Sequence, residues 1–537
     1  DFTMKSKYIL SALLLSAGLA AEAQDVYKFE ALSGNDLTGT ARYVGMGGAM
    51  NALGADLSTM GTNPAAIGLY RKSDAAITAS ITSQPDGIEL YDLKKTRASF
   101  DQLGFVYACR IGDETVRFMN FGFNYQKRRN FKNTLSTGGN LDGGLSQSWQ
   151  IADIAARDNL LYDGGDQGWL TQQSYDVCPL GYAGYQSYLI DAEESADGKS
   201  VNYLPSNANS YQYRRAQWGG IHEFDFNVSF NFKDRFYAGL TVGCYDVSLK
   251  SGVVYGENII GYDNGNRVDI GPYLMNSEEK LSGNGVDVKL GFILRPIESN
   301  PFRIGFSVST PTFYNLTQSN YLQMTSPWYD NGSATAYTEY EQDVIPIDYK
   351  LRTPWRINLS AATTIENILA LDLEYEYANY SSTNVRYNTY DYYDSWDNGT
   401  RDYALDTEAD ECLKGVHTFK VGAEAKIAKG LFLRAGYNYV SAPHKQDAFL
   451  NLFTNSPSYL AATYTDYVNL GELHRGTFGL GYRGKHFYAD AAYQYQTQKG
   501  DFYPFHYSSE GTITNDLAAT SVNFKRNNVI LTIGYKF

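Results

Sequence analysis

The sequence predicts an all-β protein, a transmembrane antiparallel β-barrel of about fourteen strands with an N-terminal plug. From Ser73 onward, segments of about 9 to 16 residues alternate apolar and polar side chains with a period of two. Aromatic residues make up 15% of the chain, with 46 Tyr and 27 Phe, which suits a barrel with aromatic girdles at both membrane interfaces. Beyond Ala23, no stretch is apolar over the roughly 18 residues that a membrane-spanning helix needs.

Residues 1–23 are predicted to be upstream residues followed by a secretory signal peptide. A basic region precedes the apolar run Tyr8–Leu19, and an A-x-A cleavage motif ends at Ala23. The apolar run is too short to anchor the chain in a membrane. We therefore expect an exported protein whose mature chain begins at Gln24.

Residues 24–72 are predicted to form the plug, a hatch inside the barrel. The segment Gly39–Tyr70 is rich in small residues, which allow the backbone to pack closely and to turn sharply. Asn63 followed by Pro64 is a helix-start signal, because Asn caps free N–H groups and Pro loses nothing at the first helical position. A short helical turn is therefore expected from Ala65.

Gly45, Gly47 and Gly48 in this segment invite comparison with a dinucleotide-binding loop. The third glycine of the G-x-G-x-x-G fingerprint would fall at Met50, no buried strand precedes it, and no acidic residue is placed to hold a ribose. We therefore interpret the three glycines as close-packing residues of the hatch.

The barrel is predicted to occupy residues 73–537. In the clearest strand, Phe224 and Phe226 share one face while Asp225 and Asn227 share the other. About fourteen segments show this pattern: 73–83, 97–109, 115–130, 220–232, 235–249, 284–295, 302–316, 347–363, 368–381, 415–427, 431–440, 471–483, 486–496 and 521–537.

The connections between these segments support the same architecture. Tight turns such as Lys233-Asp234 and Gly484-Lys485 follow every second strand, and long connections follow the others. Bacterial barrels alternate in this way, with short turns in the periplasm and long loops outside. The last strand, Val529–Phe537, ends on an aromatic residue and resembles the terminal signal by which outer-membrane barrels are recognised for assembly.

The longest connection, about residues 131–219, contains a segment from Leu145 to Asp158 with helical periodicity. Two interpretations stay open for this loop. It packs on itself at the surface, or its apolar surface captures an apolar ligand, since exposed apolar loops often mark binding sites.

Charge and cysteine usage exclude several classes of partner. The net charge of −14 argues against a nucleic-acid partner, which would favour a basic face. Cys109 and Cys244 fall in predicted strands, whereas Cys178 and Cys412 fall in long loops, where they could pair in an oxidising compartment. The four cysteines lack the spacing of a metal site, so we predict neither metal nor cofactor.

Several motifs carry a family resemblance. The segments Gly39–Arg42 and Gly45–Ala49, followed by Asn63–Ala65, resemble the N-terminal hatch of FadL/TodX-type transporters of hydrophobic compounds. Thr353–Arg356 and Arg434–Tyr439 are similar to strand motifs of the same family. The resemblance covers most of the chain after the signal peptide and lapses in the loops.

The resemblance implies a channel in the outer membrane of a Gram-negative bacterium. The channel would take up long-chain fatty acids or other small hydrophobic molecules, be gated by the hatch, and release its cargo laterally or through the lumen. Its partners would be the apolar ligand, outer-membrane lipids and the barrel assembly machinery. In that family the Asn-Pro-Ala element lies against a kink in the third strand. Gly122 and Asn124 are the candidates here, since a glycine would relax the ladder and open a side gap.

The lumen of the predicted barrel is expected to be blocked and to carry charged side chains. A barrel of about fourteen strands leaves a hole unless it is blocked, and an occluded lumen favours regulated passage of a specific solute over free diffusion. Four cationic side chains are expected to point inward and are candidate ligands for a carboxylate: Arg303, Arg356, Lys420 and Arg434. The alternative is that they pair with inward acids and stiffen the wall.

Other functional classes receive less support. The six His are scattered and no G-x-S-x-G motif accompanies them, so we predict no catalytic residues and no enzyme activity. The main alternative is a haem-binding or other surface receptor. His444 and His506 are expected in or near extracellular loops, and imidazole is a common iron ligand. A passive sugar porin is disfavoured by the hatch.

Overall fold

The protein is described by a computed structural model over residues 25–112, 115–158, 178–194, 201–263, 265–330, 333–387, 399–508 and 515–537. The predicted signal peptide lies outside the described residues. None of the helices in the described part of the chain is long and apolar enough to span a membrane.

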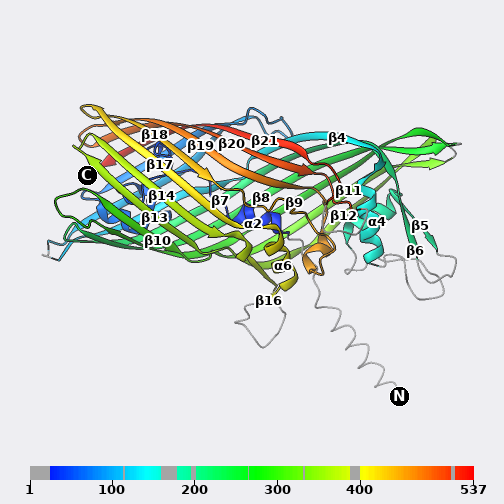
Figure 1. Cartoon of the computed structure of the whole chain (residues 1–537), viewed down its shortest axis with the longest axis horizontal. Coiled ribbons are helices and arrows are strands. Elements are labelled where there is room, and N and C mark those ends of the chain that lie inside the picture. Colours follow the sequence, from blue (N-terminus) through cyan, green and yellow to red (C-terminus); the bar gives the residue numbers. More distant parts are fainter. Residues whose placement is uncertain are drawn as a thin grey trace, which may run out of the picture.

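Fourteen antiparallel strands form a closed ring in which the last strand pairs with the first (Figure 1). Each strand pairs with its two neighbours in the ring, so the barrel wall has no free edge. The strands of the ring are β1 (Asp74–Ser83), β2 (Thr96–Arg110), β3 (Val116–Asn130), β7 (Asn207–Phe232), β8 (Phe236–Asp263), β9 (Asn266–Leu294), β10 (Arg303–Ser309), β13 (Arg356–Ile365), β14 (Leu369–Asn379), β17 (Gly415–Ala428), β18 (Leu431–Val440), β19 (Tyr467–Arg483), β20 (Phe487–Tyr503) and β21 (Thr520–Lys536). Every predicted strand overlaps one of these, and the predicted barrel is confirmed.

The outer surface of the ring carries an apolar belt. On β21, Leu531 and Ile533 are 58% and 61% exposed, whereas Ile530 and Thr532 between and beside them are buried. Tyr535 also points outward at the short-turn end of the strand. A wall that is apolar on its outer face and polar on its inner face is the pattern of a transmembrane barrel. Short turns face the periplasm in bacterial barrels, so we call this end periplasmic and the other extracellular.

Several strands continue far beyond the belt on the extracellular side (Figure 1). The predicted long connections at 250–283 and 317–346 are wrong as loops, because both are strand hairpins: β8 runs directly into β9, and β11 into β12. The additional strands on this side are β4 (Asn133–Leu145), β11 (Phe313–Asp330), β12 (Ser333–Arg352), β15 (Asn384–Tyr387) and β16 (Thr400–Arg401), with a separate hairpin β5 (Ile190–Glu194) and β6 (Val201–Pro205).

Short helices cover this extracellular extension and share one apolar core with its strands. The predicted helix at 145–158 is confirmed as α4 (Gln147–Arg157), where Ser146 caps the first turn. Ile151 of α4 is buried in this core, as are Leu180 of α5, Tyr255 of β8 and Tyr273 of β9. The other covering helices are α5 (Pro179–Gln186), α6 (Tyr403–Cys412), η3 (Tyr380–Ser382) and η4 (Pro457–Ala461). The long loop is therefore self-packed in its described part.

The N-terminal segment lies inside the barrel. Its elements are α2 (Val26–Ser33), α3 (Ala41–Gly45), η1 (Leu57–Gly61) and η2 (Pro64–Leu69). α3 contacts β18 to β21, and η2 contacts β3 and β7 to β9 on the opposite side of the ring. The predicted helical start is confirmed, since the Asn63 side chain accepts a hydrogen bond from the N–H of Ala65 and Pro64 is the first helical residue. We call residues 25–72 the plug.

Candidate functional site

The plug is held by two carboxylates of β14. Glu374 accepts hydrogen bonds from the backbone N–H groups of Met50 and Asn51, each at 2.6 Å. Asp372 accepts from those of Ala52 and Leu53, at 3.2 and 2.9 Å. These four N–H groups are buried in a turn of the plug, where an unpaired donor is costly. The wall therefore supplies the acceptors that the plug backbone lacks.

Close backbone contact fixes the plug between α3 and η1. Gly47 has a φ of +65°, and a Cβ there would lie 2.8 Å from the backbone N of Tyr437. A Cβ on Gly436 of β18 would lie 2.2 Å from the backbone N of Gly47. Gly45 approaches Gly479 of β19, and Gly48, also at positive φ, packs against the plug's own Leu37. The glycines predicted for the hatch are thus contact residues. The barrel wall has glycines at two of these contacts, Gly436 opposite Gly47 and Gly479 opposite Gly45.

The Asn63–Ala65 element is seated on β7, β8 and β9. The carbonyl of Pro64 accepts a hydrogen bond of 3.3 Å from Asn227. A Cβ on Gly291 of β9 would lie 2.1 Å from Oδ1 of Asn63, and one on Gly239 of β8 would lie 2.4 Å from the carbonyl carbon of Pro64. This element of the plug therefore lies against the fourth to sixth strands of the ring.

The expected relaxation of the ladder at Gly122 and Asn124 is wrong. β3 pairs with β2 and β7 through both residues without a register shift, and the shifts between β3 and β7 lie near the ends of β3. A Cβ on Gly122 would lie 2.4 Å from Cε of Met60 in the plug, so the glycine makes room for this side chain. Asn124 accepts a hydrogen bond of 2.8 Å from Gln102 on β2.

The four predicted cationic ligands all point inward, but each is already paired with the wall or the plug. Arg434 binds Glu424 at 2.5 Å and Asp490 at 2.7 Å, and Arg42 of the plug binds the same Glu424 at 3.0 Å. Lys420 lies 3.3 Å from Glu374. The other two bind plug carbonyls: Arg303 donates to Leu53 at 2.9 Å, and Arg356 donates to Ser33 and to the carboxylate of Glu376. Their geometry favours the wall network that the sequence left as an alternative.

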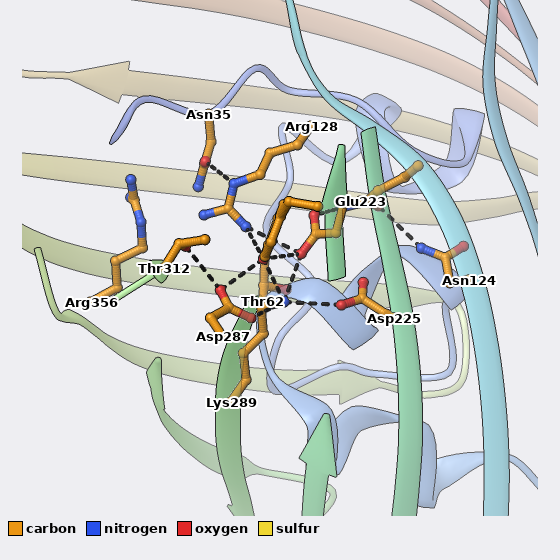
Figure 2. A network of polar contacts seen from close by, with 12 residues as sticks. Asn35, Thr62, Asn124, Arg128, Glu223, Asp225, Asp287, Lys289, Thr312 and Arg356 are labelled. Carbon is orange, nitrogen blue, oxygen red and sulfur yellow. Dashed lines mark hydrogen bonds and ion pairs between the residues drawn. The ribbon is translucent and has the colours of Figure 1, made fainter. Parts of the chain in front are cut away.

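A second buried network escaped the sequence analysis (Figure 2). Nζ of Lys289 lies 2.6 Å from Glu223, 2.9 Å from Asp225 and 3.1 Å from Asp287. Arg128 binds the same Glu223 at 3.1 Å, so two cations face three carboxylates. The signal was present in the sequence, since the alternation of β7 and β9 places all of these residues except Arg128 on their polar faces.

This network reaches the plug through the Asn35–Asp36 segment. Nε of Arg128 donates to the Asn35 side chain at 2.7 Å, and Nη2 of Arg475 donates to the Asn35 carbonyl at 3.2 Å. Asp36 accepts a 2.8 Å hydrogen bond from the N–H of Asn130 and lies 3.7 Å from both Arg475 and Arg526. Side chains and backbone of β3, β19 and β21 therefore clamp one short segment of the plug.

Above this clamp the plug and the barrel wall border a cavity of about 230 Å³. Apolar side chains form much of its wall: Phe131, Leu249, Val253, Val468, Leu470, Leu473 and Phe524. Charged side chains complete the lining, six cations and five carboxylates, among them Arg129, Arg475 and Arg526 near Asp36. We call this cavity the extracellular chamber.

Below the clamp the lumen narrows to small voids. Cavities of about 70 and 30 Å³ border Asp36, Leu37 and Thr38, and one of about 10 Å³ lies near Asp56 and Asp490. The last is smaller than or comparable to the space that one water occupies. Residues of the plug line all three of these voids.

The histidines proposed for haem lie in the connections after β18 and β20, as expected. His444 is buried there: it stacks on Tyr27 of the plug, and its Nδ1 accepts from the N–H of Leu470 at 3.1 Å. Burial lowers the pKa of His444 to about 4 and keeps the ring neutral. His506 stacks on Phe449. Within the described ranges no cluster of three or more metal-ligating side chains occurs.

A disulfide between Cys178 and Cys412 is wrong as well. Both cysteines are buried and free. The Sγ of Cys178 lies 3.6 Å from the carbonyl of Ala462, and that of Cys412 lies 3.4 Å from the carbonyl of Phe449. The two thiols thus pack beside different carbonyls of the extracellular core.

No family model matches the chain, and no curated protein sequence matches it either. Among solved structures, the chain is similar to a FadL homologue of Pseudomonas aeruginosa, with 13% identity, a TM-score of 0.48, and coverage of 94% of this chain and 99% of that chain. It is also similar to the toluene transporter TodX of Pseudomonas putida (12%, 0.45, 94% and 99%) and to the toluene transporter TbuX of Ralstonia pickettii (14%, 0.44, 94% and 99%). The family that the sequence resembles is thus represented among these structures.

Proposed function

We propose that the protein is a bacterial outer-membrane channel for the uptake of small hydrophobic molecules, gated by the plug. The observation that carries the proposal is the extracellular chamber, a cavity with both apolar and charged walls that ends on the plug. Concave apolar cavities with a few convergent polar groups are the usual form of a small-molecule site. A pore for hydrophilic solutes would instead hold a continuous channel of water in its lumen.

The polar end of the chamber favours long-chain fatty acids within this class. Arg129, Arg475 and Arg526 gather around Asp36, so cations outnumber carboxylates in this part of the chamber wall. Nε2 of His444 is buried at the chamber wall and lacks a hydrogen-bond partner among the described residues. A carboxylate headgroup would satisfy these groups, and its alkyl chain would lie along the apolar wall.

Gating follows from the same contacts. A ligand carboxylate would compete with Asp36 for Arg475 and Arg526, and these contacts help to hold the Asn35–Thr38 segment across the lumen. Thr38 is tied to β3 by one hydrogen bond of 2.7 Å from its hydroxyl to the carbonyl of Lys127. Ligand binding would therefore weaken the clamp on the segment that separates the chamber from the smaller voids.

We expect the double variant Arg475→Gln/Arg526→Gln to bind a long-chain fatty acid about 10- to 150-fold more weakly, since hydrogen bonds to charged groups contribute about 1.5 to 3 kcal/mol. Binding is measured by displacement of a fluorescent fatty acid from the detergent-solubilised protein. The matched control is Arg214→Gln, an outward cation on β7.

A neutral hydrocarbon serves as the second ligand in this experiment. Its affinity should change little in the double variant, because it makes no ionic contact with the arginines. Equal losses for both ligands would show that the variant has lost its chamber, and unchanged fatty-acid binding would contradict the proposed headgroup site.

A further inference from the structure

A patch of cationic side chains lies on the outer surface, away from the lumen. On β12, Tyr349 and Leu351 are buried in the core, so the residues that alternate with them point outward. The cross-strand register then places four cations beside one another: Lys350 pairs with Arg386 of β15, Arg386 pairs with Arg401 of β16, and Arg352 follows Lys350 on β12. We call these four residues the basic patch.

Two acidic side chains of the described chain lie beside the patch. Arg401 forms an ion pair of 2.5 Å with Asp406, and Asp348 above Lys350 accepts a hydrogen bond from Thr317. Burial and the two neighbouring guanidinium groups of Arg386 and Arg401 lower the pKa of Arg352. Nε of Arg386 is buried and lacks a hydrogen-bond partner within the described chain. The chain as a whole has a net charge of −14, so this local excess of positive charge is opposite in sign to the net charge of the protein.

The patch lies at the upper edge of the apolar belt. The guanidinium of Arg352 lies 5.4 Å from the ring centre of Phe313, which is exposed on the outer face. Trp355, three residues further toward the periplasm, is 56% exposed. Amphipathic aromatic rings mark the membrane interface, so the patch lies where the headgroups of the outer leaflet are found.

An apolar groove of about 450 Å³ lies further down the outer wall. Its outward-facing lining consists of Leu359, Leu373, Tyr375, Phe419, Val421 and Tyr437, on β13, β14, β17 and β18. β13 continues the path of β12 after a short break, and β15 follows β14 in the same way. The groove therefore lies below the patch, about 23 Å along the strand from Arg352 to Leu359 at 3.3 Å per residue.

We propose that the basic patch and the groove together form a binding site for a phosphorylated lipid of the outer leaflet. The guanidinium groups of Arg352 and Arg386 would bind a headgroup phosphate by charge-assisted hydrogen bonds, for which the planar fork of arginine is well suited. One acyl chain would then run down the wall into the groove. Patch and groove are independent features, and their alignment on adjoining strands points to one amphipathic ligand.

The test is binding of lipid A, compared with its dephosphorylated form, to the detergent-solubilised full chain by native mass spectrometry. We expect Arg352→Gln/Arg386→Gln to bind lipid A about tenfold more weakly. Arg214→Gln/Lys280→Gln removes the same charge from outward positions on β7 and β9 and should bind as the unmodified chain does. Leu373→Trp fills the groove and should weaken binding of both lipid forms.

Two results would overturn the proposal. One is equal binding of lipid A and its dephosphorylated form by the unmodified chain, and the other is equal loss in the two double variants. The site faces the membrane and not the lumen, so fatty-acid binding in the chamber should be the same in all of these variants. Failure of the lipid site would thus leave the proposed uptake function untouched.

Discussion

A valine at Gly436 is expected to displace the plug from the barrel wall. The Cβ of any side chain there would lie 2.2 Å from the backbone N of Gly47 and 2.3 Å from the carbonyl carbon of Met46. These are backbone atoms, which cannot avoid the new side chain by a change of rotamer. The plug segment itself therefore has to move. Overpacking of this kind costs about 1 to 3 kcal/mol, which shifts a two-state population by a factor of roughly 5 to 150.

The expected readout is ion conductance through single barrels in a planar bilayer. Gly436→Val should raise the fraction of time spent in a conducting state, because the lumen of a barrel of this size is open once the plug leaves. The matched control is Gly476→Val on β19, where a Cβ meets no atom within 4 Å. Conductance that stays at the unmodified level in Gly436→Val would contradict the assignment of this contact as a plug anchor.

The second large effect is expected on stability, from Lys289→Met. Lys289 is buried and contacts three carboxylates within 3.1 Å, so its removal leaves Arg128 as the cation bound to Glu223. Breaking a buried ion pair by removing one partner costs about 3 to 5 kcal/mol. Met has a similar length and no charge, which separates the electrostatic loss from a loss of packing.

Unfolding in urea from lipid vesicles measures this loss. The control is Lys250→Met, whose ion pair with Glu278 is 47% and 45% exposed at the two side chains. An exposed pair contributes about 0 to 1 kcal/mol, so the control should unfold close to the unmodified protein. Equal unfolding free energies for Lys289→Met and Lys250→Met would show that the buried network does not stabilise the barrel.

The ring of strands could be predicted from the sequence because a membrane barrel imposes the same alternation on every strand. Outside the membrane that constraint ends, and the alternation alone no longer marks a strand. The extensions of β8 and β9 were therefore expected to be loops, although they pair residue by residue up to Asp263 and Asn266. Their stability comes from the extracellular core, in which the rings of Tyr255 and Tyr273 are in contact and Tyr273 donates a hydrogen bond to Gln147 of α4.

The candidate site was harder to predict, because its pairs join strands that are distant in the sequence. Periodicity alone predicts that Lys420 and Arg434 face the lumen. Their pairing with Glu374 and Asp490 depends on the register of the closed ring, which periodicity does not give. Gly122 was misread for a related reason. A glycine in a strand marks either a bulge or a close approach, and only the position of Met60 in the plug distinguishes the two.

The measurement that tests the central claim most directly is uptake of a radiolabelled long-chain fatty acid. It uses Gram-negative cells that lack their own transporter and carry the full chain in the outer membrane. The account predicts saturable uptake above that of cells without the protein, with no increase in the passage of a hydrophilic sugar. Folded protein that admits no fatty acid, or that admits the sugar equally well, would contradict it.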